Sequence, residues 1–138
     1  MVRAPPADEV HLLICEDVRN EADGKLSLMG VCGPSLIVPQ VPCTIPSLCC
    51  VLLLMNPVRH YPEVEFSLVK PDGQTLATSR GGMPPNPTDG LPFQTQHAFK
   101  LYPVPIPVAG TYGIRLVLGS GPDVVEMHRT LVVRGSAR

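Results

Sequence analysis

Several features that would assign this chain to a functional class are missing from its sequence. No stretch approaches the ~20 apolar residues of a transmembrane helix, and residues 1–6 contain no apolar core of signal-peptide length. The 11 basic and 12 acidic residues are interspersed, so no concentrated basic face for nucleic acid or an anionic membrane is expected. We therefore expect a cytoplasmic protein whose partners include neither nucleic acid nor membrane.

The common motifs of catalysis and metal binding are also missing. The sequence has no Cys-x-x-Cys, His-Glu-x-x-His, Gly-x-Ser-x-Gly or phosphate-binding glycine loop, and its aspartates are scattered rather than clustered as in a calcium loop. We expect no catalytic residues, no metal ligands, no cofactor and no enzymatic activity. A triad assembled from distant Ser, His and Asp stays open, because such sites are defined by geometry.

The five cysteines do not form a disulfide framework. Their number is odd and their spacing matches no secreted scaffold, so buried, reduced thiols are expected. Cys49 and Cys50 are adjacent, and neighbouring side chains of a strand point to opposite faces. The two sulfurs therefore cannot close one metal site, and we interpret both as small apolar residues of a core.

Seventeen prolines divide the chain into short extended segments. The segments between them are rich in Val, Leu and Ile, which often alternate with polar residues as in half-buried strands. The sequence predicts an all-β fold: a single antiparallel β-sandwich, immunoglobulin-like or C2-like, of seven or eight short strands with proline-rich loops. A barrel is the main alternative. Residues 9–134 would form this domain, with a flexible arm at 1–8 and a flexible tail at 135–138.

The alternation is clearest in residues 63–70, where Val64, Phe66 and Leu68 should face inward, and in the segment ending at Leu118. Residues 20–24 predict a hairpin loop in which Gly24 takes a positive φ. The prolines of residues 34–46 leave room for one short edge strand, at 36–38. Residues 47–55 are apolar on both faces, so this strand must be covered from two sides.

Five short segments stand in a fairly specific order along the chain: Cys15-Glu-Asp-Val-Arg19, Gly24-Lys-Leu-Ser-Leu-Met-Gly30, Ile45-Pro-Ser-Leu48, Pro62-Glu-Val-Glu-Phe-Ser-Leu-Val-Lys-Pro-Asp-Gly73 and Gly110-Thr-Tyr-Gly-Ile-Arg-Leu116. Together they resemble a family of small, mostly bacterial proteins of unknown function, DUF6941, from about residue 9 to residue 133. The resemblance implies a stand-alone β-sandwich and supplies no activity or site. Many relatives carry a tryptophan near residues 56–62, whereas this chain has none.

The first functional hypothesis is an interaction module that binds itself or another protein through an apolar sheet face. The outer face of residues 47–55 and a nearby tyrosine would form this interface: Cys49, Val51, Leu53, Met55 and Tyr61. Large exposed apolar faces mark such contacts. Alternatively, a loop of the same chain, such as residues 33–46, covers that face, and the sequence does not decide between the two.

The second hypothesis is a small-ligand-binding protein or enzyme that uses residues 81–92 as a lid. This segment is rich in proline and glycine and predicts a long surface loop. Arg80, His97 and Arg129 would contact the ligand. The pattern places Arg129 on the inner face of its strand, which predicts a β-bulge or a ligand there. A histidine such as His97, at the edge of a core, is more often structural than catalytic.

Overall fold

The computed structural model describes residues 10–55, 61–83, 85, 88–91, 94–119 and 124–136. Apart from the short 3₁₀ turn η1 (Ala22–Gly24), its regular elements are strands: β1 (Val10–Asn20), β2 (Leu26–Cys32), β3 (Ser35–Val38), β4 (Cys43–Ile45), β5 (Leu48–Met55), β6 (Glu63–Val69), β7 (Thr75–Gly82), β8 (Gln94–Leu101), β9 (Val104–Ile106), β10 (Gly110–Leu118) and β11 (Val125–Gly135). The all-β prediction is confirmed. No helix in the described ranges has the length and apolar character needed to cross a membrane.

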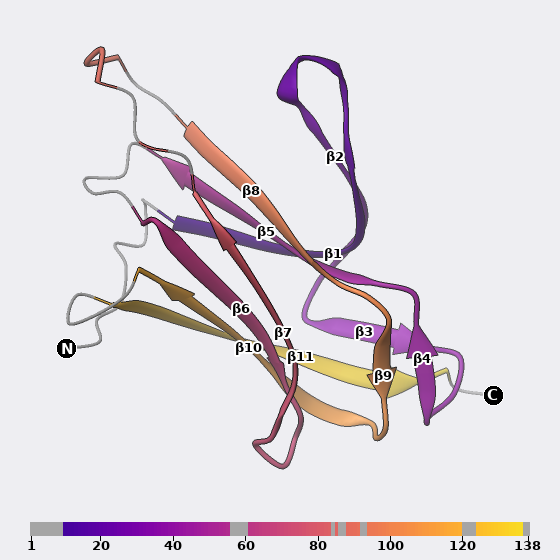
Figure 1. The fold of residues 1–138 in the computed structure, drawn as a ribbon. Coiled ribbons are helices and arrows are strands. Elements are labelled where there is room, and N and C mark those ends of the chain that lie inside the picture. Colours follow the sequence, from indigo (N-terminus) through magenta and orange to yellow (C-terminus); the bar gives the residue numbers. More distant parts are fainter. Residues whose placement is uncertain are drawn as a thin grey trace.

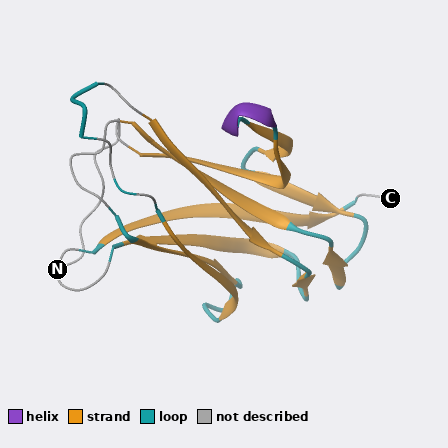
Figure 2. Cartoon of the chain, turned by 45° about the horizontal axis from the view of Figure 1, so that its top comes forward, coloured by secondary structure: helices purple, strands orange, loops and turns teal. Residues whose placement is uncertain are grey.

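Two main sheets face each other across a shared core (Figures 1 and 2). One sheet has the order β2-β1-β5-β8, the other β3-β11-β10-β6-β7, and β4 and β9 form a small third sheet. The described part of the chain thus holds eleven strands, and the predicted seven or eight was too few. Two of the additional strands, β4 and β9, are three residues long and come from proline-rich segments, and β9 itself contains Pro105.

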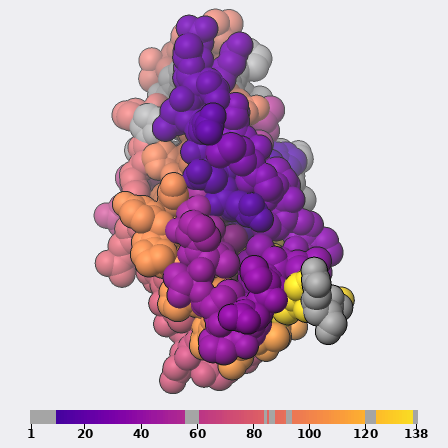
Figure 3. All heavy atoms as spheres, turned by 90° about the vertical axis from the view of Figure 1, so that its right-hand side faces the viewer, coloured from indigo at the N-terminus to yellow at the C-terminus, as the bar shows by residue number. Residues whose placement is uncertain are grey.

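Two features of residues 33–46 depart from the prediction. This segment contributes β4 as well as β3, because Cys43 to Ile45 pair with Ile106 to Val104. In addition, β3 runs parallel to β11, so the fold is not purely antiparallel. In Figure 3 the yellow C-terminal atoms lie next to this part of the chain. The parallel pairing extends to Gly135, and the Ser136 amide donates to the Val38 carbonyl at 2.7 Å.

The predicted alternation agrees with the observed burial in the five-stranded sheet. Val64, Phe66 and Leu68 of β6 are all buried, as are four inward-facing residues of β10: Tyr112, Ile114, Leu116 and Leu118. The Tyr112 hydroxyl donates to the Val108 carbonyl at 2.7 Å, so this polar atom is satisfied inside the core. The period-two pattern therefore identified the inner face of this sheet correctly.

Strand β5 lies inside the four-stranded sheet and is buried from both sides, as the sequence predicts. Its inner face, including Cys50, packs into the shared core. On its outer face, Cys49 and Val51 form a second cluster with Cys15. Three side chains of the β1–β2 hairpin pack against this cluster: Val18, Leu26 and Leu28. The loop 33–46 is therefore not the cover of this part of the face; the hairpin is.

A bend lets the hairpin return over its own sheet. Cys15 pairs with Val31 and Asp17 with Met29, but the intervening Glu16 and Gly30 do not pair. Gly30 has φ 65°, in the left-handed region, and a Cβ there would lie 2.7 Å from the Glu16 Oε2. Beyond this point the hairpin leaves the plane of the sheet, as Figure 1 shows. In Figure 3 its indigo and violet atoms form the top of the visible face.

Polar contacts to β8 hold the hairpin in place. The Gln96 side-chain amide donates to the Gly24 carbonyl at 2.9 Å, and the Lys100 ammonium lies 3.0 Å from Asp17 Oδ1. Gly24 has φ 73°, as the sequence predicts, and Asp23 before it has φ 65°. The hairpin tip and its base are thus each tied to the same neighbouring strand.

Replacing Gly30 with alanine should weaken the fold, because an L-residue at this φ is strained and its Cβ displaces the Glu16 side chain. We expect Gly30→Ala to lower the free energy of unfolding by about 1–3 kcal/mol, measured by urea denaturation. Gly33→Ala is the matched control, since no heavy atom lies near its Cβ position and its φ is ordinary. Equal effects of the two changes would contradict a special role for Gly30.

Candidate functional site

The five residues of the predicted interface have different environments. Cys49 and Val51 are each 1% exposed and lie beneath the hairpin. Tyr61 is buried in the shared core rather than on the outer face. Leu53 is half-buried and Met55 is 38% exposed, so the far end of β5 is the accessible part. Within the single chain, the predicted face is therefore only partly open.

The open part of this face continues onto the neighbouring strands. Leu13 of β1 pairs with Val51 and is 36% exposed, and Val31 of β2 pairs with Cys15 and is 56% exposed. Because partners in antiparallel strands lie on the same face, these side chains lie on the outer face with Leu53 and Met55. We call Leu13, Val31, Leu53 and Met55 the open patch. The alternation of side chains along β1 and β2 places Leu13 and Val31 on one face of each strand. Only the sheet order shows that this face continues onto β5.

The three predicted ligand contacts do not meet. Arg80 lies on the outer face of the five-stranded sheet, where it is bonded to Glu65. His97 belongs to β8 of the other sheet and packs against Phe99, with ring centroids 4.7 Å apart. Arg129 is on β11, which two strands separate from the β7 of Arg80. Arg80 and His97 line two different grooves, and Arg129 lines neither of them.

Arg129 is not displaced by a bulge. The pairing between β10 and β11 is continuous, with Arg129 opposite Ile114, so the predicted bulge is wrong for this pair of strands. Arg129 is exposed and donates to the His128 carbonyl at 3.1 Å. The parallel partner β3 pairs with β11 only from Val132 onward, so the edge of β11 is free at Arg129. At such an edge, a long side chain that starts on the inner face can still reach water.

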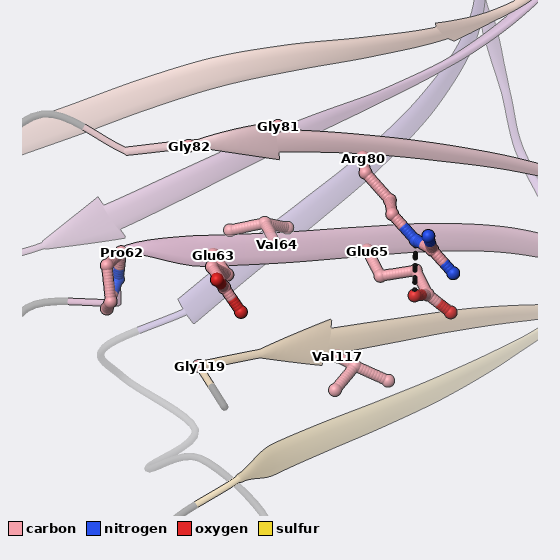
Figure 4. A pocket seen from close by; sticks show the side chains of 9 residues that line it. All are labelled: Pro62, Glu63, Val64, Glu65, Arg80, Gly81, Gly82, Val117 and Gly119. Atoms are coloured by element: carbon pink, nitrogen blue, oxygen red, sulfur yellow. Dashed lines mark hydrogen bonds and ion pairs between the residues drawn. The ribbon is translucent and has the colours of Figure 1, made fainter. Parts of the chain in front are cut away.

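A shallow groove of about 560 Å³ lies where β6 begins and where β7 and β10 end (Figure 4). Its lining residues are Pro62, Glu63, Val64, Glu65, Arg80, Gly81, Gly82, Val117 and Gly119. The glycines have no side chains to fill this space. On β7, the Arg80 Nε lies 2.9 Å from the Glu65 Oε2. Of the three predicted ligand contacts, only Arg80 lines this groove. The predicted loop also begins later than expected, since β7 includes Gly81 and Gly82.

Further along the same outer face, Glu126 accepts a hydrogen bond from the Arg115 guanidinium and lies 3.0 Å from His128 Nε2. The contact with Arg115 lowers the pKa of the Glu126 carboxyl, with a smaller contribution from His128. Such partly exposed ion pairs contribute little to stability. They do keep this face hydrophilic, in contrast to the open patch.

The structure also brings together two thiols whose proximity the sequence pattern does not predict. Cys15 and Cys49 stand directly opposite each other on β1 and β5, whereas Cys50 lies in the other cluster. The predicted divergence of Cys49 and Cys50 is thus confirmed. Burial raises the pKa of Cys15 to about 11 and raises that of Cys49 as well. Among the described residues, no three His, Cys, Asp or Glu side chains group as ligands for a metal ion.

Burial lowers the pKa of His97, so the unfolded chain takes up this proton at a higher pH than the folded chain does. The stability that depends on neutral His97 is therefore present above the ordinary pKa of about 6.5 and is lost as the pH falls through it. We expect the free energy of unfolding to fall between pH ~7 and pH ~5, and to fall less in His97→Gln. Urea denaturation at each pH measures both slopes, and equal slopes would exclude this role of His97.

Comparisons with known proteins give a family and a distant structural similarity. No curated protein matches the chain. A solved structure, the crystal structure of the C-terminal domain of wzt, is 15% identical with a TM-score of 0.43, covering 94% of this chain and 75% of that chain. The model of the family of unknown function DUF6941 matches residues 10–124. This match spans most of the chain and confirms the resemblance of its sequence segments, so the chain belongs to the DUF6941 family.

Proposed function

We propose that this chain is a non-enzymatic interaction module that associates with a second copy of itself through the open patch. The observation that supports this proposal is the run of Leu13, Val31, Leu53 and Met55 across three neighbouring strands of one sheet. Exposed apolar side chains are ordinary when single, but contiguous ones favour association.

The chemistry around the open patch suits an identical partner. The cross-strand neighbours of Leu53 are His11 and Gln96, and that of Met55 is Gln94. A two-fold contact places the same residues of both copies against each other, so a face with like charges would repel itself. Neighbours without a carboxylate, ammonium or guanidinium group limit this repulsion and leave a polar rim around the apolar centre.

The proposed module is a sandwich of the immunoglobulin-like or C2-like kind, and we place it in the cytoplasm. Supporting the sandwich, buried side chains of both main sheets contribute to one shared core. Supporting the location, all five cysteines are free thiols, which is the usual state of cysteines in a reducing compartment.

Self-association can be tested with a charge placed in the open patch. We expect the wild-type chain to dimerise at micromolar concentration and Val31→Glu to raise the dissociation constant roughly tenfold or more, because the contact would bury an unpaired carboxylate. Sedimentation velocity over a range of concentrations measures both constants.

Ile37→Glu is the matched control for this experiment. Ile37 is 68% exposed on β3, in the other sheet, so the same charge is added outside the open patch. We expect this variant to dimerise as the wild type does, with both variants folded by circular dichroism. A wild-type chain that remains monomeric at high micromolar concentration would refute self-association, as would equal effects of the two variants.

One observation favours a second candidate function, the binding of a small polar ligand in the groove beside residues 81–92. The groove combines the exposed Arg80 guanidinium with the carboxylates of Glu63 and Glu65 and with glycine backbone. Groups of both charge signs suit a small molecule with an amino and a carboxylate group, such as a free amino acid.

Titration with free amino acids tests this candidate. We expect amide NMR shifts at Gly81, Gly82 and Gly119 on binding, and their loss in Arg80→Gln, because the carboxylate partner would be gone. Arg129→Gln should leave the shifts unchanged, since two strands, β10 and β6, separate Arg129 from β7. If no amino acid moves these three resonances, the groove does not bind this class of ligand.

A further inference from the structure

Cys15 and Cys49 form a cross-strand dithiol on the outer face of the four-stranded sheet. The two residues are direct partners in the antiparallel pairing of β1 and β5. Both side chains belong to the cluster beneath the hairpin, and their thiols are close enough for each to shift the pKa of the other. Their backbone neighbours also accept from them, since the Cys15 sulfur lies 3.4 Å from the Asp17 carbonyl and the Cys49 sulfur lies 3.9 Å from the Glu16 carbonyl.

This register suits a disulfide. Directly opposed residues of antiparallel strands have Cα atoms about 4.5–5.5 Å apart, within the range of roughly 4.4–6.8 Å found across disulfides. A bond between the sulfurs therefore requires side-chain rotation and little movement of the backbone. The other thiols are positioned differently: Cys50 is in the shared core, Cys32 pairs with Ile14, and Cys43 pairs with Ile106 of β9.

A path for a small reagent leads to Cys49. A groove of about 370 Å³ between the hairpin and β8 is lined by Cys49 together with polar residues, including Asn20, Gln96 and Lys100. This volume far exceeds the ~30 Å³ that one water molecule occupies in the liquid, so a molecule of the size of hydrogen peroxide can enter. Cys15 does not line this groove. Cys49 is therefore the sulfur that meets the reagent, and Cys15 lies behind it.

The charges near Cys49 act in opposite directions. Burial is the main reason that the pKa of Cys49 is raised, and the Asp17 carboxylate adds to it, while the Lys100 ammonium partly offsets both. Lys100 is held near the thiol by its contact with Asp17 at 3.0 Å. Because the thiolate is the reactive form, the reaction at neutral pH will be slow compared with that of an exposed, low-pKa cysteine.

We propose that Cys15 and Cys49 are a redox modification site, a dithiol that hydrogen peroxide converts into a disulfide between β1 and β5. The Cys49 thiolate attacks one peroxide oxygen, the O–O bond breaks, and the departing hydroxide takes up a proton to become water. Cys49 is now a sulfenic acid. The Cys15 sulfur attacks it, the S–S bond forms, and the sulfenic oxygen leaves as a second water with the Cys15 proton. Two thiols are oxidised, and one peroxide is reduced to two waters.

Peptide mapping of the full chain tests this site. We expect the reduced protein, treated with hydrogen peroxide and digested without reductant, to yield a linked peptide containing Cys15 and Cys49, with the loss of two free thiols per chain. Dithiothreitol should restore both thiols. The oxidised chain should also unfold at a higher urea concentration, since the bond joins segments that are far apart in sequence.

Two variants distinguish this pair from general thiol oxidation. In Cys15→Ala, the Cys49 sulfenic acid has lost its partner and should become trappable by dimedone. In Cys32→Ala, the matched control, the linked peptide should form at the wild-type rate. The site is refuted if wild-type thiols are lost without a bond between Cys15 and Cys49, or if they persist under peroxide that oxidises free cysteine. Both of these outcomes are measured on the wild-type chain, so they decide the question even if a variant fails to fold.

Discussion

Burial of β5 from two directions is the constraint on which the rest of this structure depends. Seven of its eight residues are fully or partly buried, and none of the eight is polar apart from its two thiols. Its inner face is covered by the facing sheet, as in any two-layer β fold. Within the described ranges no third layer covers its outer face, and the end of the first hairpin packs there instead. The bend at Gly30, the ties to β8 and the buried thiol pair all belong to this arrangement.

Sequence patterns predicted the parts of the fold that depend on local alternation. The inner residues of β6 and β10 are those that the period of two indicated. The two-sided burial of β5 also followed directly from its composition. Such features can be predicted because the pattern of apolar residues within one strand indicates which of its faces are buried, whichever strands become its neighbours.

The features that the sequence did not predict all depend on which strands become neighbours. Parallel pairing of β3 with β11 joins segments about a hundred residues apart, and the β4–β9 ribbon joins two proline-rich segments that each look like linkers. The Cys15–Cys49 pair has the same origin, since a thiol in β1 meets one in β5 only when sheet order and register are known. Likewise, Arg80, His97 and Arg129 are plausible contacts in sequence, yet the sheet order separates them.

The length of the hairpin explains why the open patch exists. Beyond the bend, β1 continues for four residues, Asp17 to Asn20, or roughly 13 Å at about 3.3 Å per residue. Strand β5 has eight residues, roughly 26 Å by the same rise. An arm half as long as the strand covers the half near Cys49 and Val51, so Leu53 lies at the border of the covered cluster and Met55 lies beyond it. A single hairpin thus produces both a buried dithiol and an exposed apolar patch on one face of one sheet.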